Sequence, residues 1–270
     1  MSPTGRFTGK VAVVTGGSSG IGLATCRRLH EEGACVVMAA RRADVGAAMA
    51  TSFNSDRVFF QPTDVTQRTQ LDDLFGIVVE RFGRLDVLVN NAGAASFGSV
   101  STLRPLKWRQ SIDINLNAVF DACQAALPRL QATVASGRAA GASIVNIASI
   151  AAVAGDRGMA AYNAAKAGVL NFTRTLALEL APQKIRVNAV SPGAIDTPLA
   201  AATAKVPRIA EVFNEAIPLG RFGRPEEIAA AIAFLAADEA SFITGANLLV
   251  DGGVSAGTGH PDLTRLFDGR

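Results

Sequence analysis

A strand, a glycine-rich turn and a helix follow one another near the start of the chain. The apolar run over residues 11–14 predicts a short buried strand, and helical character extends from the turn to about Glu32, with Gly33 placed to end the helix. The turn reads TGGSSGIG over residues 15–22. Glycines let the main chain approach a pyrophosphate, and the first turn of a helix offers free N–H groups and a positive dipole end. In this context the turn predicts a dinucleotide site, and a tight turn without a ligand is the alternative.

Strands and helices alternate along the whole chain. Because no composition break, linker or internal repeat interrupts this order, the sequence predicts one domain over residues 1–270 with an α/β, Rossmann-type fold and a doubly wound parallel sheet. Residues 197–220 are expected to be irregular or weakly helical and to form a lid. Further strands are expected at about 35–39, 58–60, 85–89, 143–147, 185–190 and 246–250, and helices at about 66–82, 108–135, 158–181 and 225–237.

Small and polar residues come directly after three of the expected strands. They are the NNAG segment at 90–93, Ser149, and the SPG segment at 191–193. Open α/β sheets bind ligands in the crevice outside the carboxyl ends of their strands. We therefore expect these segments and the glycine turn to meet at one edge of the sheet.

Tyr162, the only tyrosine of the chain, lies four residues before Lys166 in a segment with helical periodicity. Residues four apart share a helix face, so the phenol and the ammonium are expected to be neighbours. A nearby ammonium favours the phenolate and lowers the pKa of a tyrosine, which would let Tyr162 transfer a proton near neutral pH. Thirteen positions separate Ser149 from Tyr162, enough for a loop that brings both hydroxyls to one substrate oxygen. The Tyr–Lys pair alone is a weak signal, because any helix can carry one.

The residues after the second strand bear on the choice of cofactor. In a dinucleotide fold an acidic residue at this place binds the ribose 2′-hydroxyl of NAD. The chain instead has Ala40 followed by Arg41 and Arg42, which can pair with the 2′-phosphate of NADP. The missing carboxylate favours NADP(H) as the cofactor, with NAD(H) possible. The alternative is that both arginines are solvated loop residues without a role in cofactor binding.

Composition excludes several classes of function. With 49% hydrophobic residues the chain can bury a sizeable core, and a formal charge of +3 without a basic run argues against nucleic-acid binding. The three cysteines match no metal or disulfide framework, so buried free thiols, a reducing compartment and a cytoplasmic location are expected. The two histidines lie far apart, which predicts no catalytic metal, and no apolar run is long enough to span a membrane.

Taken together, these motifs resemble the short-chain dehydrogenase/reductase family over residues 9–253. The glycine turn, the NNAG segment, Asn115, Ser149 with the Tyr162–Lys166 pair, and the SPG segment with Thr197 carry the resemblance. The resemblance implies that the catalytic residues are Asn115, Ser149, Tyr162 and Lys166. It implies cofactor contacts at Gly16, Ser18, Ser19, Gly20, Ile21, Gly22, Arg41, Arg42, Asp64, Val65, Asn91, Ala92, Gly93, Tyr162, Lys166, Pro192, Gly193, Ile195 and Thr197.

The resemblance also implies roles for the four catalytic residues. Tyr162 would be the general acid in reduction and the general base in oxidation, and Ser149 would hold and polarise the substrate oxygen. Lys166 would lower the Tyr162 pKa and bind the nicotinamide ribose. Asn115 would hold a water that relays protons between Lys166 and solvent.

Three features depart from the family pattern. Ser19 stands where many NADP-preferring relatives have a basic residue, which weakens the NADP prediction without reversing it. The loop 135–142 is slightly long. The tail over residues 254–270 is expected to be a surface-packed or disordered end. A sharper hypothesis is that the tail, through His260 and Phe267, packs on a neighbouring subunit.

The predicted function is an NADP(H)-dependent oxidoreductase that interconverts a ketone or aldehyde with an alcohol. Alternatives are an NAD-dependent dehydrogenase of the same family, or a catalytically silent cofactor-binding sensor or scaffold. Arg157 could bind a substrate carboxylate, or could be a surface charge. A homotetramer or homodimer is expected, packed through helices near 108–135 and 158–181. An apolar substrate pocket is expected from Ala94, Ala95, Ala151, Ala152, Val153 and Leu199.

Overall fold

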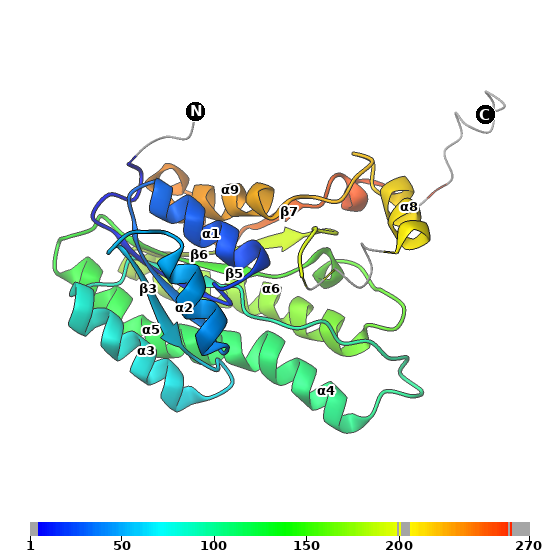
Figure 1. Cartoon of the computed structure of the whole chain (residues 1–270), viewed down its shortest axis with the longest axis horizontal. Coiled ribbons are helices and arrows are strands. Elements are labelled where there is room, and N and C mark those ends of the chain that lie inside the picture. Colours follow the sequence, from blue (N-terminus) through cyan, green and yellow to red (C-terminus); the bar gives the residue numbers. More distant parts are fainter. Residues whose placement is uncertain (1–4, 199, 201–205, 259, 261–270) are drawn as a thin grey trace.

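A single seven-stranded sheet forms the middle layer of the molecule, with helices on both faces (Figure 1). The computed structural model describes residues 5–198, 200, 206–258 and 260. All strand pairs are parallel and the order is β3-β2-β1-β4-β5-β6-β7, which confirms the predicted doubly wound sheet. The strands are β1 Val11–Thr15, β2 Cys35–Ala40, β3 Val58–Pro62, β4 Val87–Asn90, β5 Ala142–Ile147, β6 Ile185–Pro192 and β7 Asn247–Val250.

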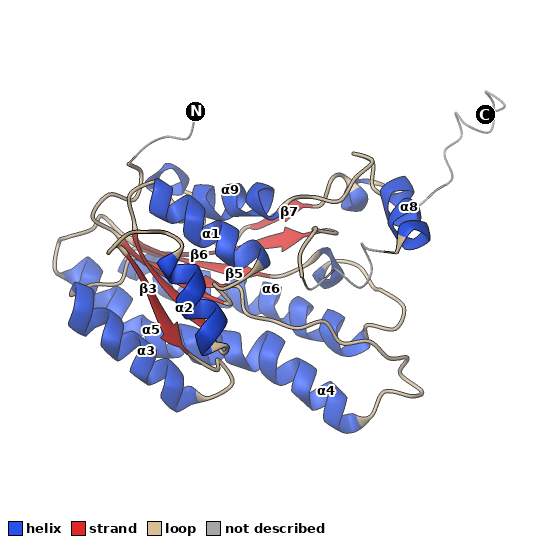
Figure 2. Cartoon of the chain, in the orientation of Figure 1, coloured by secondary structure: helices blue, strands red, loops and turns tan. Residues whose placement is uncertain are grey.

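The helices divide between the two faces of the sheet (Figure 2). Helices α1 and α9 pack together on one face, and α3, α5 and α6 cover the other. The α-helices are α1 Gly20–Glu31, α2 Ala43–Thr51, α3 Arg68–Phe82, α4 Pro105–Ile112, α5 Ala118–Ala135, α6 Ala160–Leu180, α8 Pro207–Ala216 and α9 Pro225–Ala236. Short helical turns are η1 Asp113–Asn117, η2 Ile150–Ala152, η3 Ala181–Gln183, η4 Asp238–Ala240 and η5 Val254–Ala256.

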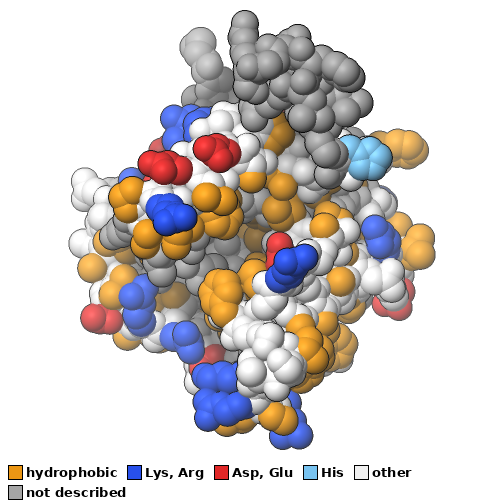
Figure 3. Space-filling model, turned by 90° about the vertical axis from the view of Figure 1, so that its right-hand side faces the viewer, with side chains coloured by type: hydrophobic (Ala, Val, Ile, Leu, Met, Phe, Trp, Pro, Cys, Tyr) orange, Lys and Arg blue, Asp and Glu red, His pale blue; other side chains and the backbone are white. Residues whose placement is uncertain are grey.

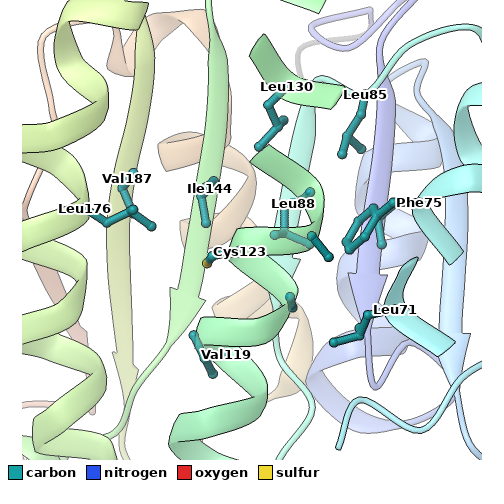
Figure 4. Close-up of a cluster of buried hydrophobic side chains, with 14 of the residues drawn as sticks. Leu71, Phe75, Leu85, Leu88, Val119, Cys123, Leu130, Ile144, Leu176 and Val187 are labelled. Carbon is teal, nitrogen blue, oxygen red and sulfur yellow. The ribbon is translucent and has the colours of Figure 1, made fainter. Parts of the chain in front are cut away.

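The hydrophobic core lies on both faces because each central strand is covered twice. All five residues of β1 are buried, and so are all six of β5, which explains why both strands are mostly apolar. On the α3–α5–α6 face, Phe75, Leu88 and Ile144 are fully buried (Figure 4). On α6, Val169, Leu176 and Leu180 are buried and face the core. Phe172 is only partly buried.

Several boundaries differ from the prediction for identifiable reasons. Strand β4 begins at Val87, two residues later than predicted, and the two preceding residues make hydrogen bonds through side chains. The Leu85 N–H donates to Thr133 Oγ1 at 2.9 Å, and the Asp86 carboxylate accepts from the Val11 N–H at 2.8 Å. Helix α2 was not predicted, because its nine residues are alanine-rich and show little amphipathic periodicity.

Three further expectations need correction. Residues 207–216 form a regular helix, α8, in the segment expected to be irregular or weakly helical. The long helix expected at 108–135 is interrupted by a π-helical turn at Asp113–Asn117. Cys35 is partly exposed rather than buried, because it starts its strand. The predicted tail and Leu199 lie largely or wholly outside the described residues.

Candidate active site

The segments predicted to bind ligands meet at the carboxyl ends of the strands. The strand arrows in Figure 2 point toward the right-hand side of the view, and Figure 3 looks onto that face. Hydrophobic side chains gather near the middle of the face, and Lys and Arg side chains are scattered over it, several of them at its lower edge (Figure 3).

The glycine turn and the NNAG segment are locked to each other. Thr15 Oγ1 accepts hydrogen bonds from the N–H groups of Asn91 and Ala92, at 3.0 and 3.1 Å. The Asn91 side-chain amide donates to the Thr15 carbonyl at 2.9 Å and to the Gly16 carbonyl at 3.3 Å. The Asn91 side chain therefore holds the glycine turn in place, because its amide N–H groups donate to main-chain carbonyls of that turn.

Packing within the protein explains two of the glycines. Gly16 has a positive φ of 66°, and a Cβ there would lie 2.8 Å from the Asn91 amide nitrogen. A Cβ at Gly22 would lie 2.2 Å from the Gly16 carbonyl oxygen, closer than any real contact. These glycines are required by packing even before a ligand is considered, in line with the tight turn that the sequence analysis left open as the alternative.

The amino end of α1 fits a phosphate group. Ser19 is the N-cap residue, and its side chain makes no capping bond to the helix. The first N–H groups of the helix therefore keep their hydrogen-bonding capacity and the positive dipole end. Gly20 has a positive φ of 51°, and a Cβ there would lie 3.3 Å from the Thr197 side chain. The Thr197 side chain thus lies beside Gly20 of the turn, and its contact with a cofactor stays a prediction.

A groove of about 600 Å³ continues from this edge toward α4. Its lining includes Arg41, Thr66, Ala94 and Ala95. Arg42 is the exposed N-cap residue of α2 and is not among the lining residues. The structure thus separates the two arginines that the sequence treated as equivalent.

The other predicted cofactor residues fall into two groups. Asp64 borders the edge and is engaged by its own turn, since Oδ1 accepts from the Thr66 N–H at 3.0 Å and from the Thr66 hydroxyl at 2.8 Å. Gly93 is exposed and lies near Asn115 and Lys166. Gly193 packs on Asp251, which a Cβ at position 193 would approach to 2.8 Å. The residues that are largely or wholly buried, and so contribute to packing, are Ser18, Val65, Pro192 and Ile195; Ile21 is partly buried against the same core.

Three of the four predicted catalytic residues lie just after β5 or on α6. Ser149 is the N-cap residue of η2, and its Oγ accepts a hydrogen bond from the Ala151 N–H at 3.1 Å. Because that bond uses an oxygen lone pair, the hydroxyl proton is free to be donated to a ligand. Lys166 Nζ donates to the Ile147 carbonyl at 2.7 Å and lies 5.8 Å from the centroid of the Tyr162 ring. The sequence-predicted pair is thus brought together beside Ser149.

The pKa of Tyr162 is shifted in the direction opposite to the sequence prediction. Burial raises the pKa of the phenol, the neighbouring Ser149 hydroxyl lowers it, and the Asp156 carboxylate raises it. Burial also lowers the pKa of Lys166 from 10.5 to about 8. The ammonium is itself desolvated and carries its charge less readily, and the expected lowering of the Tyr162 pKa is therefore not found.

Asn115 is fully buried in the π-helical turn, and its amide is engaged on both sides. Oδ1 accepts from the Ala94 N–H at 3.1 Å, and Nδ2 donates to the Ala94 and Ser111 carbonyls, each at 3.0 Å. A Cβ at Gly93 would lie 2.8 Å from Asn115 Oδ1 and 3.7 Å from Lys166 Nζ, so a side chain at this position would crowd Asn115. The amide holds the loop in place, and the water relay stays a prediction.

Sequence reasoning missed a set of buried amides that hold α6 in place. Asn90 Nδ2 donates to Asn146 Oδ1 at 2.9 Å, and Asn146 Nδ2 donates to Thr173 Oγ1 at 2.9 Å. This series links β4 and β5 to the helix that carries Tyr162 and Lys166. An asparagine inside an apolar strand was the available signal, because buried polar groups need partners.

The described residues were also compared with what a metal site and a membrane-spanning helix require. Within the described part of the chain, no three His, Cys, Asp or Glu side chains come together as metal ligands would. No described helix has the length and apolar character needed to cross a bilayer.

Comparison with known proteins gives an independent result. The family profile described as "Enoyl-(Acyl carrier protein) reductase" matches residues 16–255. Trans-4-hydroxycyclohexanecarboxylate dehydrogenase of Sinomonas cyclohexanicum is 42% identical over 260 residues, covering 93% of this chain and 95% of the relative. The cis-4-hydroxycyclohexanecarboxylate dehydrogenase of the same organism is 44% identical over 253 residues, covering 93% and 98%. The crystal structure of gox2181 is similar, with a TM-score of 0.88 and 35% identity over 93% of this chain and 98% of that chain.

The fold and the similar proteins define an oxidoreductase of the kind that uses a nicotinamide dinucleotide. The chain belongs to the short-chain dehydrogenase/reductase family. It is an enzyme that acts on the CH–OH/C=O pair.

Proposed function

We propose that the enzyme interconverts a secondary alcohol and a ketone with NADP(H), using Tyr162 as the proton-transferring group. The observation that supports this most is the meeting of the Ser149 hydroxyl, the Tyr162 phenol and the buried Lys166 ammonium at the carboxyl end of β5. A catalytically silent sensor has no such need for a buried lysine beside a buried phenol.

A nicotinamide cofactor would supply or accept the hydride at the substrate carbon. In reduction, the carbonyl oxygen accepts hydrogen bonds from Ser149 and Tyr162, and the phenol proton moves to that oxygen as the hydride arrives at carbon. In oxidation the alcohol proton passes to the Tyr162 phenolate, and the carbon loses its hydride. Lys166 faces both the phenol and the space beside Gly93, so its remaining protons are available there.

The residues at the cofactor edge fit the pyrophosphate and favour the 2′-phosphate of NADP. The uncapped end of α1 is suited to the pyrophosphate, and the positive φ of Gly20 allows a close main-chain approach. Arg41 lines the adjoining groove, and no carboxylate stands at the end of β2 to bind a free ribose hydroxyl.

The test is a steady-state assay of a ketone and aldehyde panel with NADPH and NADH in parallel. Turnover with NADPH should fall by about 10²–10⁴-fold in Tyr162→Phe, because general acid–base catalysis contributes that much. Retention of the full rate in Tyr162→Phe would remove the tyrosine from the mechanism.

Arg41→Ala with Arg42→Ala as its matched control tests the cofactor choice. Losing a charge-assisted bond to the 2′-phosphate should weaken NADPH binding by about 10–100-fold while NADH binding changes little. Arg42→Ala should have a much smaller effect, since Arg42 does not line the groove. Equal losses for NADPH and NADH would contradict the proposed role of Arg41.

We further propose a homotetramer located in the cytoplasm. Leu106 on α4, Phe120 on α5 and Leu178 on α6 are 57%, 47% and 79% exposed, an apolar character that suits an interface. Analytical ultracentrifugation should give about four times the 27.9 kDa chain mass, and a monomeric mass would contradict the assembly. Cell fractionation tests the location.

A further inference from the structure

Phe242 is the most exposed of the large apolar side chains that the structure describes. The main chain on both sides of it is nevertheless fixed. The Ser241 N–H donates to the Asp238 carbonyl at 3.0 Å, and the Ile243 carbonyl accepts from Asn188 Nδ2 at 2.8 Å. An isolated apolar side chain on a surface is ordinary, but this ring is held out from a fixed main chain beside a groove.

The groove has a volume of about 540 Å³ and lies at the amino ends of β4, β5 and β6, so it opens at the edge of the sheet opposite to the candidate active site. Its lining is mostly apolar, and the small residues Ala140, Gly141 and Ala181 leave room for an aromatic ring. Phe242 lines the same groove. A projecting ring and a recess that can receive one therefore lie on a single patch, which is the arrangement that a two-fold contact between identical chains requires.

The charges of the groove are largely paired within the chain. Lys10 Nζ lies 2.6 Å from Asp238 Oδ1, and the Arg186 guanidinium donates to the Leu235 and Ala237 carbonyls at 2.7 and 2.9 Å. Two copies of this patch would therefore meet with little repulsion between like charges. A strongly charged partner such as a nucleic acid would find few groups to pair with, so a second copy of the chain is the occupant that the charges favour.

This patch is separate from the apolar residues proposed above as a subunit interface, which lie on α4, α5 and α6. Phe242 follows α9, and α9 covers the face of the sheet opposite to α5 and α6 (Figure 1). A tetramer of the common dihedral kind is held together by two different two-fold contacts. The residues on α4–α6 supply one of them, and the structure needs a second surface for the other.

We propose that Phe242 inserts into the groove of a second copy of this chain, and that this reciprocal contact is the second two-fold interface of the tetramer. The inference rests on the proposed homotetramer. Each such contact removes two aromatic rings from water, one from each chain. Because the groove lies at the amino ends of the strands, the contact leaves the edge that carries Ser149, Tyr162 and Lys166 uncovered.

Analytical ultracentrifugation of the full-length protein over a dilution series tests this contact. Phe242→Asp should convert a tetramer into dimers of about twice the 27.9 kDa chain mass, with the dissociation constant between dimers raised at least about 100-fold, as expected when a buried aromatic anchor is lost from both chains. Ala181→Glu changes only the wall of the groove and should have the same effect. Both side chains are exposed, so circular dichroism should show an unchanged fold.

Phe97→Asp is the matched control, because Phe97 is an exposed phenylalanine near the carboxyl-end edge, in the segment after β4. It should leave the wild-type mass unchanged. If Phe242→Asp or Ala181→Glu remains a tetramer, the groove is not an interface between copies and the inference is overturned, while the proposed tetramer stands. A wild-type protein that is monomeric at every concentration overturns the tetramer and this inference together, and the proposed reaction is tested separately by its steady-state assay.

Discussion

Replacing Lys166 by methionine should separate stability from catalysis. The lysine is 4% exposed, and burial lowers its pKa from 10.5 to about 8. Methionine has a similar length and no charge, so Lys166→Met removes the desolvated ammonium while largely filling its space. Activity should be lost, because the residue faces the phenol and the proposed cofactor space.

The sign and size of the effect follow from the shifted pKa. Because the folded-state pKa is the lower one, the unfolded chain binds more protons between pH 8 and 10.5, and wild-type stability rises with pH across that window. Below pH 8 the full cost of burying the charged lysine is present, and the lowering of its pKa from 10.5 to about 8 corresponds to about 3 kcal/mol. Near pH 9.5 about half of this cost, or less, remains. The difference in free energy of unfolding between Lys166→Met and the protein with Lys166 should therefore fall by about 2 kcal/mol between about pH 6.5 and 9.5.

Urea unfolding at the two pH values measures this difference. Leaving the Ile147 carbonyl without its donor costs about 1–3 kcal/mol, but that term does not depend on pH and cancels in the comparison. Both proteins should carry Tyr162→Phe, so that the phenol does not titrate. Lys107→Met, at an exposed lysine, is the control and should show no such pH dependence. An advantage of Lys166→Met that is the same at both pH values would refute the reasoning.

Three further predictions follow from contacts around the site. Asp156→Asn should lower the pKa of Tyr162, because the Asp156 carboxylate raises it. The rise of kcat/KM for oxidation with increasing pH should then occur at lower pH. A rise at the same or a higher pH would contradict this prediction. Gly22→Ala should destabilise the fold by about 2–3 kcal/mol, since its Cβ would lie 2.2 Å from a carbonyl oxygen. Gly76→Ala, in open space within α3, should be neutral or stabilising by up to about 1 kcal/mol, and thermal unfolding compares the two. Iodoacetamide should label Cys35, which is partly exposed in the native protein. It should not label the other two thiols, because they are buried and burial raises their pKa. Mass spectrometry identifies the labelled sites, and labelling of all three cysteines would contradict this prediction.

The sequence was sufficient for the seven strands and the parallel sheet, and for the meeting of Ser149, Tyr162 and Lys166. Alternation of apolar strands with helices and a glycine turn constrains topology strongly, and the i, i+4 spacing places Tyr162 beside Lys166. What the sequence could not provide depends on three-dimensional packing. The raised pKa of Tyr162 comes from burial by distant segments, and the scaffold role of Asn91 comes from contacts with Thr15, 76 residues away.

Boundary errors have a similar origin. Helix α2 has weak periodicity because alanine fits either side of a helix, and the π-helical turn at Asp113–Asn117 has no sequence signature that a hydropathy pattern detects. The difference between Arg41 and Arg42 is likewise set by which of the two lines the groove.

The contrast between the glycine turn and the exposed charged residues has a consequence for how this enzyme can diversify. Gly16 and Gly22 are wedged against the main chain and Asn91, so most substitutions there lose the fold before they alter function. Arg41 and Arg157 are exposed, and exchanging either should change stability little. Mutations at such exposed positions can therefore change cofactor and substrate preference without loss of stability, while the proposed proton-transfer residues stay the same. Proteins that evolve from such a chain would keep the reaction and differ in specificity.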